Sequence, residues 1–205
     1  MRLNAGEGAY LDFVYTLPPN EYRMNFTIQG TGLNGILAPS TTSFNLTWEQ
    51  TARQLEKGRN YEDRYTALYF KYMSDKVDNL SESGNDSEKV ADRLKWIAYK
   101  NKFFSTVLIA DQGFESTTLD SRTLTDEGVL MNFRSETSIP FDLQGQTPTA
   151  LQYYIGPNLY GLLNSYDKGV AAKDQLDLER LVPLGASIFR VINKYFIIPV
   201  FDFLG

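Results

Sequence analysis

Apolar and polar residues alternate with a period of two along the first part of the chain. One run extends from Leu11 to Leu17 and ends at Pro18-Pro19-Asn20, a second extends from Tyr22 to Ile28, and a third extends from Phe44 to Trp48. Such runs, separated by Gly, Pro and Asn, are typical of antiparallel strands with one buried face. The pattern predicts a strand in each segment.

The same period returns later in the chain. Alternation resumes over residues 94–98, and residues 103–110 (FFSTVLIA) form the most continuous apolar run of the first half. A run without alternation is typical of a strand buried on both faces, so we expect a central strand there. Further strands are predicted over 129–134, 139–143 and 149–155, with two distinct faces over 61–73, whereas 113–126 gives no clear prediction.

Two polar stretches interrupt this pattern. Residues 49–60 (EQTARQLEKGRN) permit a helix and are expected to form an exposed excursion. Residues 74–89 (SDKVDNLSESGNDSEK) are acidic, rich in Ser and Asn and almost without large apolar side chains. That composition indicates a solvated loop.

The strand-like alternation of apolar and polar residues ends at Gly156-Pro157. Asn158 is a suitable cap for a short helix over 159–166, although Gly161 weakens it. We expect a mainly β protein of about ten strands, an antiparallel β-sandwich with a helical C-terminal appendage. The predicted divisions are 1–156 for the sandwich, 157–183 for a short helix and linker packed on it, and 184–205 for the terminal segment.

The terminal segment is amphipathic and then uniformly apolar. On a helical wheel, the apolar residues between Leu184 and Phe196 share one half and the polar residues share the other, but this sidedness disappears from Ile197 onward. A helix lying on a bilayer and leading into it has this pattern, although packing on the domain's own core is the alternative. The predicted membrane-interface residues are Leu184, Ile188, Phe189, Arg190, Ile192, Lys194, Tyr195 and Phe196.

The amino-acid composition excludes several classes of protein function. The 205 residues are 42% apolar and 14% aromatic, which is enough for one large domain with a substantial core. The net charge of −5 argues against a nucleic-acid binder. The chain has no Cys and no His, which excludes thiol nucleophiles, Ser-His-Asp catalysis and ordinary zinc sites. No signal peptide is visible, and the abrupt ends favour a piece of a longer protein.

Carboxylates offer only weak candidates for catalysis. Asp12, Asp63, Asp111 and Glu115 are conceivable as a general acid and base, but nothing in the sequence pairs them. The acidic residues between Asp75 and Glu88 lack the spacing of a calcium loop, so a flexible charged loop is the better interpretation. An enzyme acting on sugars with carboxylates alone needs two of them facing each other across a pocket.

Aromatic residues suggest a further alternative. Trp48, Tyr65, Tyr69 and Trp96 are candidates for a sugar-stacking platform, which would make the chain a glycan-binding β-sandwich of a surface protein. This hypothesis requires an exposed cleft lined by several of these rings. Packing in the core and at its rim is the favoured interpretation, because aromatic side chains bury large areas in any β core.

Three stretches resemble a known family. Residues 96–104 (WIAYKNKFF) are similar to a Trp-x-Ala strand followed by a Lys-aromatic-Phe element, and residues 154–157 (YIGP) are similar to an aromatic-x-Gly-Pro turn. Residues 176–178, 184–185 and 188–201 resemble a lead-in to an interfacial helix and a transmembrane segment. On these motifs the chain resembles the large periplasmic domain of YidC-type membrane protein insertases, and residues 49–58 and 64–69 are similar to members from Bacteroidetes. The motif positions expected to have structural roles are Trp96, Ala98, Phe103, Phe104, Gly156, Pro157 and Gly185.

The resemblance implies a β-supersandwich of the galactose-mutarotase type in an inner-membrane protein that inserts and helps fold other membrane proteins. This segment would face the periplasm as a docking scaffold without catalysis or cofactor. Its partners would be the membrane surface, Sec translocon components and nascent membrane proteins, with no nucleic acid or small-molecule substrate. The functional Arg of the family lies in transmembrane helices that this sequence does not contain, so no insertase residue is carried over.

The chain departs from the family pattern at one position and in its length, and a related activity is not expected. Ala186 stands where many members have Trp, and the family domain is longer at its N-terminus. Sugar epimerases of the same fold use His beside a carboxylate, and a chain without His is not expected to share that chemistry.

Overall fold

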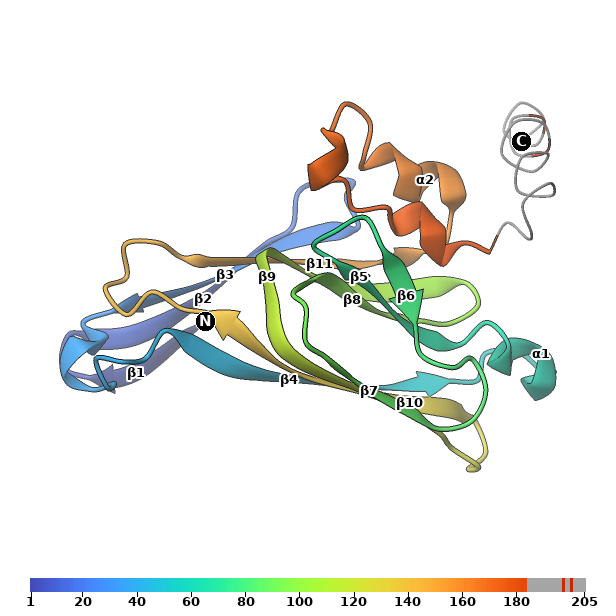
Figure 1. Cartoon of the computed structure of the whole chain (residues 1–205), viewed down its shortest axis with the longest axis horizontal. Coiled ribbons are helices and arrows are strands. Elements are labelled where there is room, and N and C mark those ends of the chain that lie inside the picture. The colour runs from blue at the N-terminus through green and yellow to red at the C-terminus, as the bar shows by residue number, and fades with distance from the viewer. Residues whose placement is uncertain (184–196, 198–199, 201–205) are drawn as a thin grey trace.

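Two antiparallel β-sheets pack face to face in the computed structural model, which describes residues 1–183, 197 and 200 (Figure 1). In order, the first sheet contains β1 (Arg2–Gly6), β2 (Ala9–Thr16), β3 (Arg23–Thr31), β11 (Thr149–Pro157), β9 (Phe104–Thr123), β8 (Leu94–Lys100), β5 (Ala67–Tyr72) and β6 (Val77–Asn79). The second contains β4 (Ser43–Arg53), β10 (Val129–Pro140), the end of β9 and β7 (Asp86–Val90). The prediction of a mainly antiparallel β-sandwich is confirmed.

Short helices complete the fold. They are η1 (Leu33–Gly35), α1 (Arg59–Asp63), α2 (Tyr160–Ser165), η2 (Ala172–Asp174) and η3 (Leu178–Leu181). The last three lie together on the outer face of the first sheet (Figure 1). The helical C-terminal appendage expected after Gly156-Pro157 is therefore present up to residue 183.

Strand β9 belongs to both sheets. Its residues 104–110 pair with β11 in the first sheet, and its residues 115–123 pair with β10 in the second. Between them Gly113 has φ +83°, and a Cβ there would meet the Met73 sulfur at 3.1 Å. Glycine is favoured at such a left-handed bend. The bend explains why residues 113–126 follow no single pattern, since the strand changes sheets within them.

The main core lies between the two sheets. Side chains alternate toward it from both layers, including Leu68, Phe70, Leu94, Leu108, Phe114, Leu119, Leu130, Phe133 and Leu151. Trp48 stacks on Tyr99 with ring centroids 3.9 Å apart, and the Tyr99 hydroxyl donates to the Trp48 carbonyl at 2.8 Å. The expected two faces of the 61–73 segment are confirmed for β5, because Leu68 and Phe70 face this core and Tyr69 packs against the opposite one.

Two predictions for polar stretches were wrong. Residues 49–53 continue β4 rather than leaving the sheet, and residues 74–89 contain β6 and the start of β7 rather than only a loop. Both β4 and β7 pair on one side only, so they lie at the edges of the second sheet. Strand β4 faces the core with Phe44, Leu46, Trp48 and Ala52, but residues 49–51 are all polar, so the sequence shows no large apolar side chain at its end.

Other boundaries also differ. The two strands expected over 129–134 and 139–143 are one strand, β10, which ends at Pro140. Eleven strands are present within the described residues, one more than the rough expectation. None of the helices among those residues has the length and apolar character needed to cross a bilayer.

The predicted membrane-interface residues between Leu184 and Phe196 lie outside the described residues, and so does Gly185. Of the terminal segment only Ile197 and Val200 are described, and both side chains are exposed.

Candidate functional site

The contact between the sandwich and residues 158–183, which we call the junction, is the most extensively built feature outside the main core. Trp96, Ala98, Val107 and Ile109 project from the outer face of the first sheet and are fully buried. Leu163, Leu176, Leu178 and Leu181 cover them from the C-terminal side. The junction is therefore a second hydrophobic core, formed only because the chain folds back over the sheet.

Trp96 fixes the position of this covering segment. Its indole N–H donates to the backbone carbonyl of Leu176 at 2.6 Å, across 80 residues of sequence. A buried Trp ordinarily finds such a partner for its polar edge. Trp96 thus supplies both apolar area and a directional bond.

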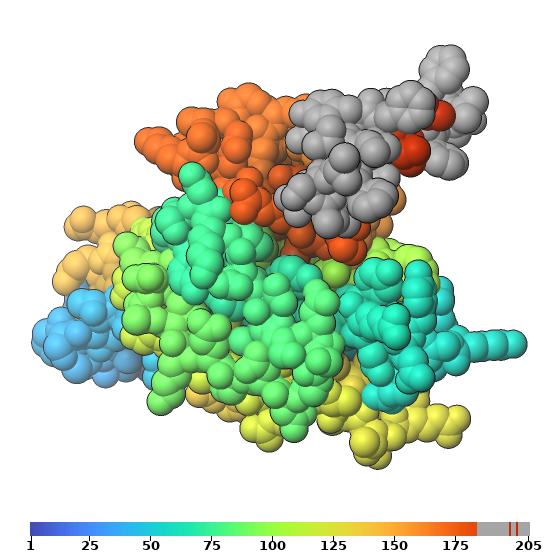
Figure 2. Space-filling view, turned by 45° about the vertical axis from the view of Figure 1, so that its right-hand side comes forward, coloured from blue at the N-terminus to red at the C-terminus, as the bar shows by residue number. Residues whose placement is uncertain are grey.

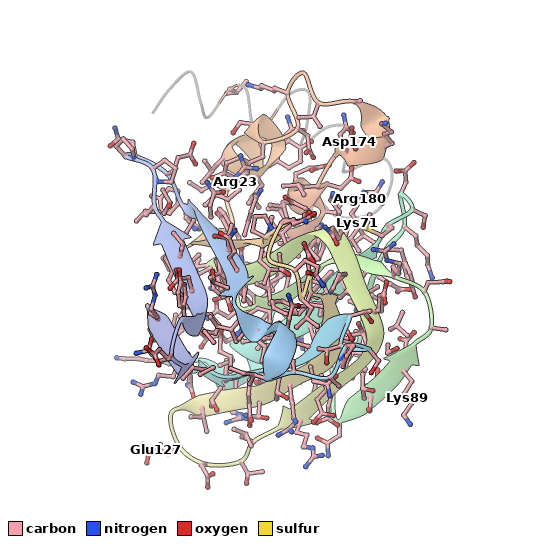
Figure 3. The ribbon with its side chains drawn as sticks, turned by 90° about the vertical axis from the view of Figure 1, so that its left-hand side faces the viewer. Arg23, Lys71, Lys89, Glu127, Asp174 and Arg180 are labelled. Carbon is pink, nitrogen blue, oxygen red and sulfur yellow. The ribbon has the colours of Figure 1, made fainter. Side chains whose placement is uncertain are left out.

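A buried ion pair lies beside the Trp96 contact. The Lys71 ammonium on β5 donates to the carboxylate of Asp177, and the Lys71 side chain is only 3% exposed. Figure 3 shows Lys71 near Arg180, which also pairs with Asp177, at 3.9 Å. Because a charge this buried needs a partner, the Lys71–Asp177 pair fixes the register of the C-terminal segment on the sheet.

Asp167 organises the backbone at the same place. Its two carboxylate oxygens accept the backbone N–H groups of Leu176 and Asp177, each at 2.7 Å. Asp177 has φ +52°, a left-handed conformation that Asp tolerates better than most residues. The Asp167 bonds hold this strained position so that the Asp177 carboxylate reaches Lys71.

Glu179 completes a group of three carboxylates. One oxygen from each of Asp167, Asp177 and Glu179 lies within 4.8 Å of the others. The Glu179 Oε2 is buried and accepts no hydrogen bond, and burial raises the pKa of this carboxyl above its ordinary value. Carboxylates in this number are the ligands of a hard cation. Here, however, Asp167 already binds backbone N–H groups and Asp177 already binds Lys71. The group therefore serves to hold the C-terminal segment in place.

The turn between β8 and β9 is held by one side chain. Asn158 donates from Nδ2 to the carbonyls of Asn101 at 2.8 Å and Lys102 at 3.4 Å, and it accepts from the Ser105 hydroxyl at 2.6 Å. Its backbone N–H donates to the Phe103 carbonyl at 2.7 Å. We call these four bonds the Asn158 clasp. They connect the start of the C-terminal segment to the tip of the hairpin.

Gly156 and Pro157 are the last two residues of β11 and pair with Ser105 and Phe104, so the turn expected at this motif begins only after Pro157. The Tyr154 hydroxyl donates to the Pro157 carbonyl at 2.6 Å, and a Cβ on Gly156 would lie 2.7 Å from that hydroxyl oxygen. Only glycine leaves room for this buried tyrosine.

The motif residues therefore fall into three groups. Trp96 and Ala98 lie in the second core, Gly156 and Pro157 end β11, and Phe103 and Phe104 are exposed at the hairpin tip.

The aromatic residues proposed to line a glycan cleft do not come together at a surface. Trp96 is fully buried in the second core, and Trp48 stacks on Tyr99 on the other side of the sheet. The Lys100 ammonium lies 5.0 Å from the ring centroid of Tyr69 and 6.0 Å from that of Tyr65. A cation thus occupies the ring faces that a sugar would need.

The carboxylates considered for catalysis are also dispersed. Asp12 pairs with Arg2 at 2.7 Å, Asp63 with Arg59 at 3.3 Å and Glu115 with Arg93 at 3.3 Å. Asp111 lines a cavity of about 220 Å³ that also includes Arg23, Lys95, Asp167 and Asp174. The four candidates therefore do not form one site.

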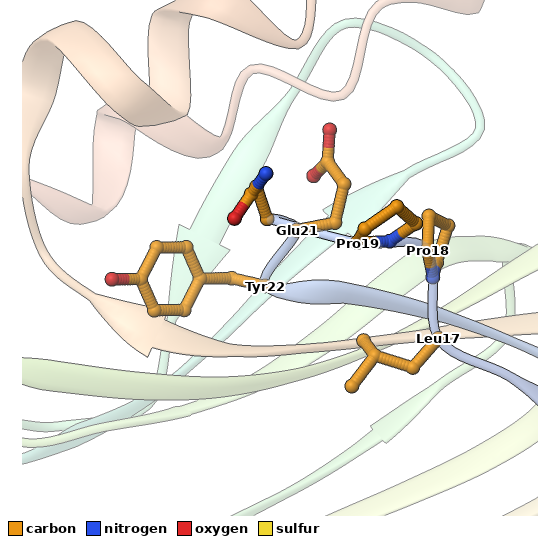
Figure 4. Close-up of a pocket in the computed structure, with 6 residues that line it drawn as sticks. Leu17, Pro18, Pro19, Glu21 and Tyr22 are labelled. Carbon is orange, nitrogen blue, oxygen red and sulfur yellow. The ribbon is translucent and has the colours of Figure 1, made fainter.

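A larger, open pocket of about 550 Å³ surrounds the β2–β3 turn (Figure 4). All of its lining residues come from the single stretch Leu17–Tyr22. Ligand sites ordinarily combine polar groups that converge from several elements, and this pocket has no such convergence.

Sequence reasoning missed the polar part of the junction. Lys71 lies on the face of β5 that contacts the second core, and no partner was predicted for it. A lysine within the otherwise aromatic and aliphatic run Ala67–Tyr72 is a signal for a buried pair. Asp177, between Leu176 and Leu178, is the corresponding signal on the other side.

Comparisons with known proteins agree with this architecture. The family described as the YidC periplasmic domain matches residues 1–198. A protein of Parabacteroides distasonis named membrane protein insertase YidC is 59% identical over the whole chain. Proteins of the same name from Bacteroides fragilis and Porphyromonas gingivalis are 46% and 39% identical, again over the whole chain.

The chain spans about a third of the length of these relatives, 32% of the first and 33% of the other two. The matches to these relatives cover all of this chain and therefore include both the sandwich and the junction. The chain belongs to the YidC periplasmic domain family.

Proposed function

We propose that this chain is the periplasmic module of a membrane protein insertase of the inner membrane. It acts there as a docking scaffold rather than as a catalyst, and the complete protein assists the insertion and folding of other membrane proteins, alone or with the Sec translocon. The observation that carries the proposal is the family match over residues 1–198, together with relatives named membrane protein insertase.

The junction supports a mechanical role for the module. The second core, the Lys71–Asp177 pair and the Trp96 bond to Leu176 fasten residues 158–183 to the sheet. A segment fastened in this way transmits the position of the following residues to the sandwich. We propose a division into a sandwich (1–156), a packed linker (157–183) and a membrane-directed segment (184–205).

In this proposal the amphipathic stretch lies on the bilayer surface. Leu184, Ile188, Phe189, Ile192, Tyr195 and Phe196 would face the acyl chains, and Arg190 and Lys194 would reach the headgroups. Gly185 would open this helix.

Vesicle flotation tests the membrane contact. The intact chain is expected to float with vesicles of phosphatidylcholine and phosphatidylglycerol, and a chain ending at Pro183 is expected to bind much more weakly. Equal binding by the two chains would contradict the interfacial role of residues 184–196.

Crosslinking in cells tests the proposed partners. A photoreactive residue placed at exposed positions of the sandwich, within the complete insertase, is expected to capture translocon subunits or nascent membrane proteins. Capture that is the same when protein synthesis is stopped would argue against contact with nascent chains.

A further inference from the structure

The turn between β8 and β9 exposes two adjacent aromatic rings. Phe103 is 43% exposed and Phe104 is 52% exposed. Gly, Asn and Asp dominate tight turns because these residues suit both the backbone and the contact with water. Two phenylalanines at such a tip keep apolar area in water that folding alone does not require.

This tip is rigidly built. The Asn158 clasp binds the carbonyls of Asn101, Lys102 and Phe103. The Asn101 N–H donates to the Phe104 carbonyl at 3.0 Å, and the Asn101 side chain accepts the Phe104 N–H at 3.1 Å. The two rings are therefore presented on a turn in which the carbonyls of residues 101–104 and the N–H of Phe104 already have hydrogen-bond partners.

Other exposed apolar side chains surround the tip. Ile155 lies on the same sheet face as Phe104, because β9 pairs Thr106 with Ile155 and Phe104 with Pro157. The Lys102 ammonium lies 4.5 Å from the Phe103 ring centroid and 4.4 Å from that of Tyr61, which connects the tip to α1. We define the end patch as Leu55, Tyr61, Phe103, Phe104, Ile155 and Leu159, all at least 43% exposed.

The end patch has a basic setting in an acidic protein. In the three segments that carry it, 53–64, 100–104 and 155–159, the exposed charged residues are Arg53, Lys57 and Arg64, all cationic, whereas the whole chain has a net charge of −5. Aromatic and aliphatic side chains with a cationic rim are the combination that binds the interface of an anionic bilayer.

The end patch also lies where the described chain leads toward its terminal segment. In Figure 1 the β8–β9 turn, α1 and the last described residues of the C-terminal segment occupy the same end of the sandwich. Figure 2 turns this end forward, with α1 and the C-terminal segment on one face of the molecule. Twenty-two residues of amphipathic and then apolar sequence follow Pro183.

We propose that the end patch is a second membrane contact, in which Phe103 and Phe104 enter the headgroup region of an anionic bilayer. The orientation of this end toward the membrane rests on the proposed function. A rigid, protruding tip can insert into the fluid headgroup region of a bilayer, because lipids rearrange around it and no complementary pocket is needed. Together with residues 184–196 it would fix the tilt of the sandwich over the bilayer.

A fluorescent reporter tests the insertion directly. Because the chain has no cysteine, Phe103→Cys gives a single site for an environment-sensitive dye such as NBD. Phosphatidylcholine–phosphatidylglycerol vesicles are expected to raise and blue-shift its emission, and spin-labelled lipid is expected to quench it. Ser40→Cys, in the exposed loop before β4 at the far end of the sandwich, is the matched control and is expected to show neither effect.

Flotation separates this inference from the proposed function. Phe103→Ser with Phe104→Ser is expected to weaken vesicle binding about five- to tenfold for each ring, the effect of transferring roughly half a phenylalanine side chain. Phe103→Leu with Phe104→Leu is the control that keeps the apolar character, and it is expected to bind nearly as the original chain does. Unchanged thermal unfolding shows that all variants fold.

Three outcomes are distinct. Binding that is reduced by the serine variant in both the intact chain and the chain ending at Pro183 supports the inference, even if truncation alone has no effect and the proposed function fails. Binding that falls only on truncation, with no dye response at position 103, overturns the inference and leaves the proposed function intact. A dye response without vesicles, which would show that the tip packs against a second copy of this chain instead of lipid, also overturns it.

Discussion

Lys71 is the residue on which the junction depends most. It is charged and almost fully buried, with Asp177 as its ion-pair partner. Lys71→Met is expected to lower the free energy of unfolding by about 3 kcal/mol, because the partly buried Asp177 carboxylate loses its closest ion-pair partner and keeps only Arg180, at 3.9 Å. Urea denaturation measures the change.

A double variant identifies the cause of that loss. Asn tolerates the left-handed conformation of position 177, so Asp177→Asn removes the charge without adding backbone strain. Lys71→Met with Asp177→Asn is expected to be more stable than Lys71→Met alone. If the double variant is no more stable than Lys71→Met alone, the uncompensated charge is not the reason.

Glu179 introduces a dependence on pH. Desolvation is the main cause that raises the pKa of its carboxyl in the folded chain, with the charges of Asp177 and Asp167 adding to it. The folded state therefore binds this proton more tightly than the unfolded state does, and stability falls as the pH rises through the window above the ordinary value of 4.5.

Glu179→Gln removes this penalty. It is expected to raise the free energy of unfolding near pH 7 by about 1 kcal/mol or less, because the group is only partly buried. At pH 4, where the carboxyl is protonated in both states, the variant and the original chain are expected to be nearly equal. Thermal unfolding at both pH values measures the difference, and an equal gain at the two values would show that ionisation is not its cause.

At the scale of elements, the β8–β9 hairpin and the C-terminal segment are one unit because of Asn158. Asn158→Ala removes three side-chain bonds of the clasp and keeps the backbone bond to Phe103. We expect stability to fall by about 1–3 kcal/mol, since Asn101 and Ser105 lose their partners at partly buried positions. Hydrogen exchange is expected to accelerate at residues 101–104 before it does in the sheet.

Asn158→Asp is the matched variant for the clasp. It keeps the oxygen that accepts from Ser105 and loses the two bonds that Nδ2 donates. Intermediate exchange rates at residues 101–104 are expected. Rates equal to those of the original chain would mean that the turn is held without these bonds.

The elements also show what the sequence can and cannot predict. Strands with one buried face, such as β2 and β3, were predictable because burial imposes the period of two on their residues. The end of β4 and most of β7 were not predictable, because the side chains of these edge segments are mostly polar and show no alternation of apolar and polar residues. The bend in β9 was hidden for a different reason, since its two halves belong to two sheets.

The junction was predictable only in its apolar part. Trp96 and Ala98 belonged to a recognisable motif and do lie in the second core. The Lys71–Asp177 pair joins residues 106 positions apart, and no local pattern specifies a partner at that distance. The local sequence pattern therefore predicted which side chains are buried, but it did not predict which charged side chains pair across the junction.

For the whole molecule, the two cores make the sandwich and residues 158–183 interdependent. One face of the first sheet is covered by the second sheet and the other by the C-terminal segment. Each large apolar side chain of the second core contributes roughly 1.5–3 kcal/mol through burial. The total is comparable with the roughly 5–15 kcal/mol by which a domain is ordinarily stable.

A chain ending at Pro157 is therefore expected to lose cooperative folding, or to unfold at a much lower temperature, because Trp96, Val107 and Ile109 become exposed and Lys71 loses Asp177. It is also expected to bind the dye ANS and to self-associate through the uncovered face. A chain ending at Pro183 keeps every junction contact and is expected to unfold as the 205-residue chain does. Calorimetry and sedimentation compare the three chains. If the shortest one is monomeric, ANS-negative and equally stable, the C-terminal segment is only an attachment and the sandwich is a complete domain without it.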